Sequence, residues 1–134
     1  MSMRRVLFAV ALASAVVLPA CSKDEGSETA DCTPLEQAAD GTTAMTVVAK
    51  NLAFDVSCVK VKPGVLSITY ENEDQGTAHN LHVTGHGVNA STDLEPGVTT
   101  QDLEVVLTEP GTYTFACDPH GSMVGKIEVA GAAS

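Results

Sequence analysis

The chain has 134 residues, the size of one ordinary domain with short extensions. Its 7 basic and 17 acidic residues give a formal net charge of −10. This balance argues against a nucleic-acid-binding protein, which needs a basic face for the phosphates. Aromatic residues make up 4% of the chain and tryptophan is absent, so we expect a core of valine, leucine, isoleucine and alanine.

The N-terminus combines two basic residues with a short apolar run. Arg4 and Arg5 precede an uncharged stretch, residues 6–18, which is shorter than the about 20 apolar residues of a membrane-spanning helix. The run closes on Leu-Pro-Ala-Cys21, which resembles the bacterial lipoprotein signal, where the cysteine carries the lipid. We therefore expect residues 1–20 to be a signal peptide and Cys21 to be lipidated. The alternative is an ordinary cleaved signal in which Cys21 has no role.

The segment after Cys21 is small, polar and acidic. Residues 22–31 (SKDEGSETAD) hold too little apolar surface to order themselves, so residues 21–31 are expected to form a flexible tether. Loss of the signal removes both arginines and no acid, which leaves 5 lysines against 17 acids, a balance of −12. The folded part is then a single domain, residues 32–134.

From Met45 onward, short stretches typical of β-strands alternate with turn residues. Residues 59–62 alternate with period 2 and stop at Pro63-Gly64, and residues 65–70 place Leu66 and Ile68 on one face. Further strands are expected at residues 47–49, 81–84, 103–107, 112–116 and 124–129. Strands at this spacing predict an all-β fold, a Greek-key sandwich or barrel. One short helix is expected at residues 34–39, with Thr33 as its cap.

Three metal-binding side chains occur within seven residues near the C-terminus: Cys117, His120 and Met123. A mixture of thiolate, imidazole and thioether favours copper. Methionine is a poor zinc ligand, and the Cys-x-x-Cys-His sequence of covalently attached haem is absent. His79-Asn80, at the start of an upstream strand pattern, offers a second imidazole.

With these motifs the chain resembles the cupredoxin family of type 1 (blue) copper proteins, of the amicyanin and plastocyanin kind. The resemblance runs from about Met45 to Ala130, and the Cys-x2-His-x2-Met spacing is similar to the short ligand loop of the amicyanin type. It implies a cupredoxin fold that holds one copper ion per chain, as Cu(II) or Cu(I).

The resemblance also implies a role for each side chain. His79, Cys117 and His120 would bind the copper in one plane, and Met123 would be the weak axial ligand. Asn80 would tie the two ligand-bearing loops together by hydrogen bonds.

The same resemblance places the ring of the C-terminal-loop histidine, His120, at the surface. Small apolar residues would surround it, including Pro119, Gly121 and residues 76–78. This surface would be the port through which electrons pass.

Two further histidines are expected outside the ligand set. His82 lies three residues after His79, which puts it on the opposite face of a strand. His86 lies between two glycines and is expected to be exposed, with a second weak metal contact left open.

The remaining cysteines, Cys32 and Cys58, are expected to form a disulfide, because disulfides persist in exported proteins. Two free thiols are the alternative. If Cys21 carries no lipid, it could instead pair with Cys32 or Cys58.

A site closed by two histidines, a cysteine and a methionine leaves no position for a substrate, so we expect an electron carrier and not an enzyme. It would be a monomer, lipid-anchored on the outer face of a bacterial cytoplasmic membrane or in the periplasm. Its partners would be a cytochrome or a membrane-bound oxidoreductase that docks near His120. One alternative is extracytoplasmic copper storage or delivery, but the chain has only 4 methionines, and this low number disfavours it. Another alternative is a binding or structural sandwich with a vestigial metal site.

Overall fold

The computed structural model describes residues 31–131. The predicted signal peptide, Cys21 and residues 22–30 of the predicted tether lie outside the described residues. None of the described residues forms a helix long and apolar enough to cross a membrane. The strands of the described part are β1 (Thr33–Pro34), β2 (Thr42–Lys50), β3 (Ala53–Phe54), β4 (Cys58–Val61), β5 (Gly64–Asn72), β6 (Ala78–His79), β7 (His82–Gly85), β8 (Val88–Ser91), β9 (Glu95–Pro96), β10 (Thr99–Leu107), β11 (Gly111–Cys117) and β12 (His120–Val129).

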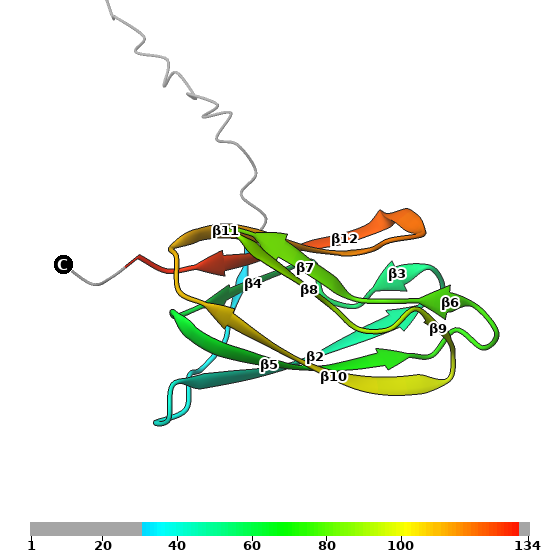
Figure 1. The fold of residues 1–134 in the computed structure, drawn as a ribbon, viewed down its shortest axis with the longest axis horizontal. Coiled ribbons are helices and arrows are strands. Elements are labelled where there is room, and N and C mark those ends of the chain that lie inside the picture. The colour runs from blue at the N-terminus through cyan, green and yellow to red at the C-terminus, as the bar shows by residue number, and fades with distance from the viewer. Residues whose placement is uncertain (1–30, 132–134) are drawn as a thin grey trace, which may run out of the picture.

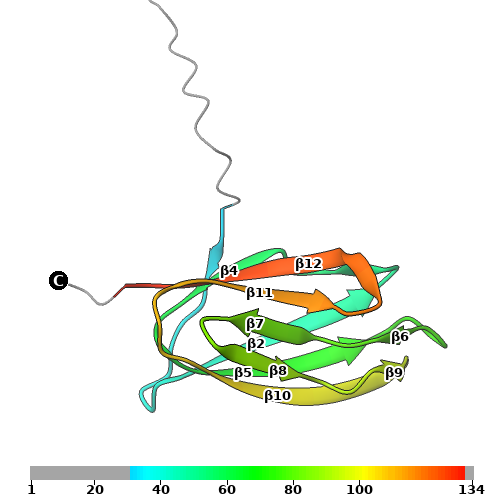
Figure 2. The same cartoon turned by 45° about the horizontal axis from the view of Figure 1, so that its top comes forward.

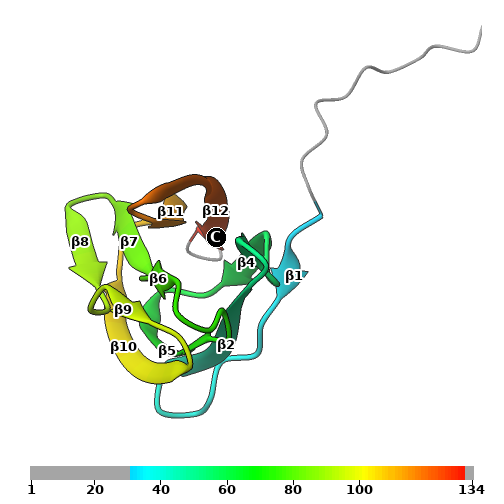
Figure 3. The same ribbon diagram turned by 90° about the vertical axis from the view of Figure 1, so that its right-hand side faces the viewer.

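The strands form a β-sandwich of two facing sheets (Figures 1 and 3). One sheet has the order β1-β4-β12-β11-β7-β8 and the other the order β10-β5-β2-β3. The short strands β6 and β9 pair separately at one end of the sandwich, near the tip of the β11–β12 hairpin (Figure 2). We call this the β6–β9 end.

The core between the sheets follows from strict alternation along the strands. In β5, Leu66, Ile68 and Tyr70 are buried, while the residues between them reach the surface, as the period-2 pattern predicts. In β12, Ile127 and Val129 point inward in the same way. This confirms the expected all-β fold.

The expectation of a purely aliphatic core was wrong. Tyr70, Tyr113 and Phe115 are the largest fully buried side chains, so the few aromatics of the chain are concentrated in the interior. The Phe115 ring fills the space opposite Gly125, its partner in the β11–β12 register. A Cβ atom at position 125 would overlap that ring, which explains a glycine in the middle of a strand.

The predicted helix at residues 34–39 was also wrong. Thr33 and Pro34 form β1, which pairs in parallel with β4, and Leu35 N–H donates to the Lys60 carbonyl. Gln37 forms an isolated bridge with Thr43. Contacts with sequence-distant strands therefore override the local preference of this segment for a helix.

Three strands begin at least four residues earlier than expected, and the first of them is β2, which starts at Thr42 rather than Val47. β10 starts at Thr99 rather than Leu103, and β12 starts at His120 rather than Val124. As a result His120 and Met123 lie on a strand, and only Asp118 and Pro119 separate β11 from β12.

The predicted disulfide between Cys32 and Cys58 is present. It joins residues 26 positions apart and fastens the beginning of the described chain to β4. On the chain-entropy account, a loop of this length stabilises the fold by about 3 kcal/mol.

Candidate metal centre

The β11–β12 hairpin brings Cys117 and His120 face to face. The two residues are register partners across a two-residue turn, and the register shifts between Ala116 and Cys117. Such an irregularity re-aims side chains at the end of a ladder. Cys117 is 2% exposed, so its thiol lies inside the sandwich.

His79 reaches the same place from another part of the chain. It ends β6, pairs with Glu95 of β9, and its side chain is fully buried. A fully buried histidine requires a partner for each ring nitrogen, because an unpaired polar atom in the interior is costly.

Three potential ligand atoms meet at this point. His79 Nδ1 lies 3.0 Å from His120 Nδ1, and Cys117 Sγ lies 3.5 Å from each of these nitrogens. A first-row metal ion sits about 2.0–2.3 Å from nitrogen and sulfur ligands, so its ligand atoms are roughly 3–4 Å apart. The triangle therefore has the dimensions of a metal site.

The thiol of Cys117 is in an environment that opposes free ionisation. Burial raises its pKa, and the backbone N–H groups of Asn80 and His120 act in the opposite direction. A buried thiolate is stable only with a positive charge nearby, which a metal ion supplies.

Asp74 determines which nitrogen of His79 is available. His79 Nε2 donates to the Asp74 carboxylate at 2.9 Å. With its proton on Nε2, the neutral ring presents a lone pair at Nδ1, on the side of Cys117. A carboxylate behind a histidine ligand in this way fixes the ring and makes it more basic.

The Asp74 carboxylate is itself held by the turn between β2 and β3. The backbone N–H groups of Asn51 and Leu52 donate to it at 2.6 and 3.0 Å. Both residues have positive φ angles, 53° and 58°, which aim two successive N–H groups at one anion. The hydrogen bonds from Leu52 and Asn51, and the one from His79, hold the pKa of Asp74 below its usual value.

Asn80 and Asp118 form a reciprocal pair that joins the two ligand-bearing segments. Asn80 Nδ2 donates to the Asp118 carboxylate at 2.6 Å, and Asp118 N–H donates to Asn80 Oδ1 at 2.9 Å. One of these residues follows His79 and the other follows Cys117, so the bonds fix the two ligands relative to each other.

Met123 is the fourth candidate metal ligand. Its side chain is 1% exposed and belongs to the same buried hydrophobic cluster as Cys117. His82 lies outside the triangle and bonds to Asp118 and Asn89. His86 is exposed, as expected, and stacks on Tyr113 with ring centroids 4.8 Å apart.

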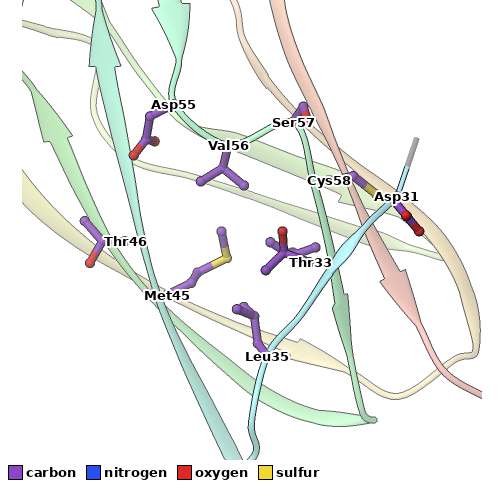
Figure 4. A pocket seen from close by; sticks show the side chains of 10 residues that line it. Asp31, Thr33, Leu35, Met45, Thr46, Asp55, Val56, Ser57 and Cys58 are labelled. Atoms are coloured by element: carbon purple, nitrogen blue, oxygen red, sulfur yellow. The ribbon is translucent and has the colours of Figure 1, made fainter.

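A separate cavity lies away from the triangle. A cavity of about 270 Å³ lies beside the disulfide and is lined by Met45, Val56 and Cys58 among others (Figure 4). None of the residues of the triangle lines it. The candidate metal centre is therefore separate from this cavity.

Residues 41–130 match the family described as copper-binding proteins of the plastocyanin/azurin family. The chain belongs to this family. Its cofactor is copper, and the sandwich described above is a cupredoxin domain. The donor set agrees with this assignment, because a thiolate beside two imidazoles, with a methionine sulfur in the same buried cluster, suits copper better than harder ions.

Individual relatives support the assignment. Amicyanin-alpha of Methylorubrum extorquens is 29% identical over 120 residues, covering 89% of this chain and 98% of the relative. A chloroplastic plastocyanin of Hordeum vulgare is 36% identical over 90 residues, covering 58% of this chain and 55% of the relative. Reduced auracyanin of Roseiflexus castenholzii has a similar structure, with a TM-score of 0.59 at 19% identity over 72% of this chain and all of that one.

Sequence reasoning missed the two carboxylates of the site. Asp74 precedes His79 by five residues and Asp118 follows Cys117 directly, but acids are common in this chain and no spacing distinguishes these two. Their roles depend on which backbone and side-chain donors the folded strands place around them.

Replacement of Asp74 by alanine should weaken copper binding. The substitution removes the acceptor that keeps the His79 proton on Nε2, and loss of such a partner typically lowers metal affinity by about 10–100-fold. Competition with a Cu(I) chelator on the folded variant measures the effect. Asp102→Ala, on the outer face of β10, is the matched control and should bind copper as the unmodified protein does. Equal affinities for the two variants would show that Asp74 does not orient His79.

Proposed function

We propose that this protein is a one-electron carrier with a type 1 copper site. The observation that supports this most directly is the meeting of Cys117 Sγ with two histidine Nδ1 atoms, 3.5 Å from each. In this proposal His79, Cys117 and His120 bind one copper ion per chain, and Met123 is its axial ligand. Bound copper supplies the exchange of a single electron between Cu(II) and Cu(I).

The surroundings of these residues favour electron exchange over catalysis on a substrate. His79, Cys117 and Met123 are buried, and the first two are held by the Asp74 and Asn80–Asp118 hydrogen bonds. Side chains fixed in this way change little between two oxidation states, which keeps the reorganisation on transfer small. His120 is partly exposed and gives the electron a path to the surface.

Two substitutions test the ligand assignments. Cys117→Ser should abolish the intense thiolate-to-copper absorption, because serine supplies no sulfur. Met123→Gln should leave copper bound and shift the reduction potential, because the axial ligand tunes it. Optical spectra, electron paramagnetic resonance and voltammetry of the copper-loaded protein measure both effects. Blue colour that survives in Cys117→Ser, or an unchanged potential in Met123→Gln, would contradict the assignment.

The same measurements separate a carrier from a protein that stores or delivers copper. A carrier is blue, is reversible in voltammetry and loses copper slowly to a chelator. Colourless Cu(I) that exchanges rapidly would instead support delivery.

The β6–β9 end offers a docking surface for a redox partner. Leu52, Leu94 and Val98 are 53%, 53% and 76% exposed. Each is tied to the site: Leu52 N–H bonds Asp74, Leu94 adjoins the β9 partner of His79, and Val98 follows Gly97, which bonds Thr77. The exposed acids Asp93 and Glu95 flank Leu94 in the chain. An apolar surface beside acidic residues fits a partner with an apolar contact area and a basic rim, as cytochromes can provide.

Val98→Ser should slow electron transfer to a basic cytochrome. Loss of the apolar contact weakens the encounter complex by about 1 kcal/mol, a roughly fivefold slower bimolecular rate. Stopped-flow mixing at several salt concentrations measures the rate, which should fall as salt rises. Val106→Ser is the control: Val106 is 60% exposed but pairs with Val65, near the opposite end of β10 from Thr99, the neighbour of Val98. Equal rates for both variants would remove this surface from the proposal.

We also propose export and a lipid anchor at Cys21. The sequence of residues 1–21 supports this, and the Cys32–Cys58 disulfide fits an oxidising compartment. A bacterial lipoprotein with more than one acyl chain is held firmly at the membrane. Intact mass of the protein from membranes should show a lipid-bearing Cys21 as first residue. Recovery of an unlipidated soluble chain in which Cys21 lies within or before the cleaved signal would contradict the anchor.

A further inference from the structure

His82 is a conspicuous group to which the proposed function gives no role. It begins β7, and its side chain is 26% exposed. Its ring Nδ1 lies 2.8 Å from Asp118 Oδ1, and its Nε2 lies 2.6 Å from Asn89 Oδ1. Both neighbours are oxygen acceptors, so a ring that satisfies both must carry a proton on each nitrogen.

Asp118 is shared between His82 and the metal centre. Its Oδ1 faces His82, while its Oδ2 accepts from Asn80 Nδ2 at 2.6 Å. The carboxylate directly follows Cys117 in the chain, and Asn80 directly follows His79. The His82 ring is therefore one hydrogen bond away from the pair that fixes the two ligand-bearing segments.

The described strands next to His82 place no second charged side chain opposite its ring in the register. Its register partners are Ser91 on β8 and Ala116 on β11, and neither side chain titrates. Among the described residues, Asp118 is the charged group hydrogen-bonded to the ring. The hydrogen bond to Asp118, followed by that to Asn89, raises the pKa of His82 above its usual value.

We propose that His82, protonated on both ring nitrogens, is a positioning residue that holds the Asp118 carboxylate against Asn80 and couples one proton to the redox state of the copper site. This inference rests on the proposed function. Reduction adds one electron from the redox partner and removes one positive charge from the site. The lower positive charge makes a proton on His82 more favourable, and the proton comes from solvent.

The sign of the effect follows from electrostatics. A positive charge on His82 disfavours the more positive oxidised site, so the reduction potential is higher while the proton is present. The proton is present at low pH and is lost as the pH rises through the pKa of His82 in the folded protein. The potential should therefore fall as the pH rises through that range.

Voltammetry across a pH series tests this with matched histidine variants. The unmodified protein and His86→Gln should show the same fall in potential. His82→Gln, which can still donate one hydrogen bond to Asp118 but cannot titrate, should lack the part of the fall that is centred on the titration of His82. The titration itself is followed by ¹⁵N nuclear magnetic resonance of the ring nitrogens in the diamagnetic Cu(I) protein.

A second variant covers the case in which His82→Gln does not fold. Asn89→Asp places another negative charge against His82 Nε2 and should move the fall in potential to higher pH. Superimposable curves for the unmodified protein and His82→Gln, or an unmoved curve for Asn89→Asp, would overturn the inference. So would a His82 ring that carries only one proton across the whole pH series. A protein that binds no blue copper would instead refute the proposed function, and the ring titration would still test the protonation of His82.

Discussion

The close approach of three electron-rich atoms is the constraint on which this structure depends. Two histidine nitrogens and a cysteine sulfur lie within 3.5 Å of one another in a buried place. Lone pairs at such distances repel unless a proton or a cation lies between them. His79 has its Nε2 proton committed to Asp74, so its Nδ1 turns an unshared pair toward the other two groups. The surrounding strands must hold this arrangement against its own repulsion whenever neither a proton nor a cation lies between the three atoms.

One carboxylate beside each ligand-bearing segment helps to hold this arrangement. Asp74, in the loop between β5 and β6, lies behind His79 and accepts from two backbone N–H groups, which stabilise its negative charge beside the ring. Asp118 follows Cys117 in the chain, and the positive charge of the protonated His82 ring offsets its negative charge. The first carboxylate favours the more positive oxidised state of a bound metal, and the imidazolium opposes the second. The balance between them is a property of the folded chain, because Asp74 of the β5–β6 loop meets the β2–β3 turn and Asp118 of the β11–β12 turn meets His82 of β7.

The parts predictable from sequence are those governed by local periodicity and spacing. Alternation predicted the inward face of residues 65–70, and the spacing of Cys117, His120 and Met123 singled out two of the three residues that meet in the candidate metal centre. Residues 34–39 could not be predicted, because their conformation depends on pairing with β4 and on a disulfide that joins cysteines 26 positions apart. The hydrogen bond between His82 and Asp118 joins residues 36 positions apart, so no local sequence pattern predicts it. Long-range partners decide such features, and a single sequence does not identify them.

The β2–β3 turn connects the surface of the β6–β9 end to the interior of the site. The Leu52 side chain is 53% exposed, yet its backbone N–H bonds the Asp74 oxygen that also accepts from His79 Nε2. The residue has a φ of 58°, an unfavourable conformation for a side chain with a Cβ, and the anion helps to hold it there. The backbone of Leu52 is therefore two hydrogen bonds away from Nδ1 of His79 and its neighbours Cys117 and His120. The hydrogen bonds from Asn51 and Leu52 to one carboxylate explain why two successive residues tolerate the left-handed region at this position.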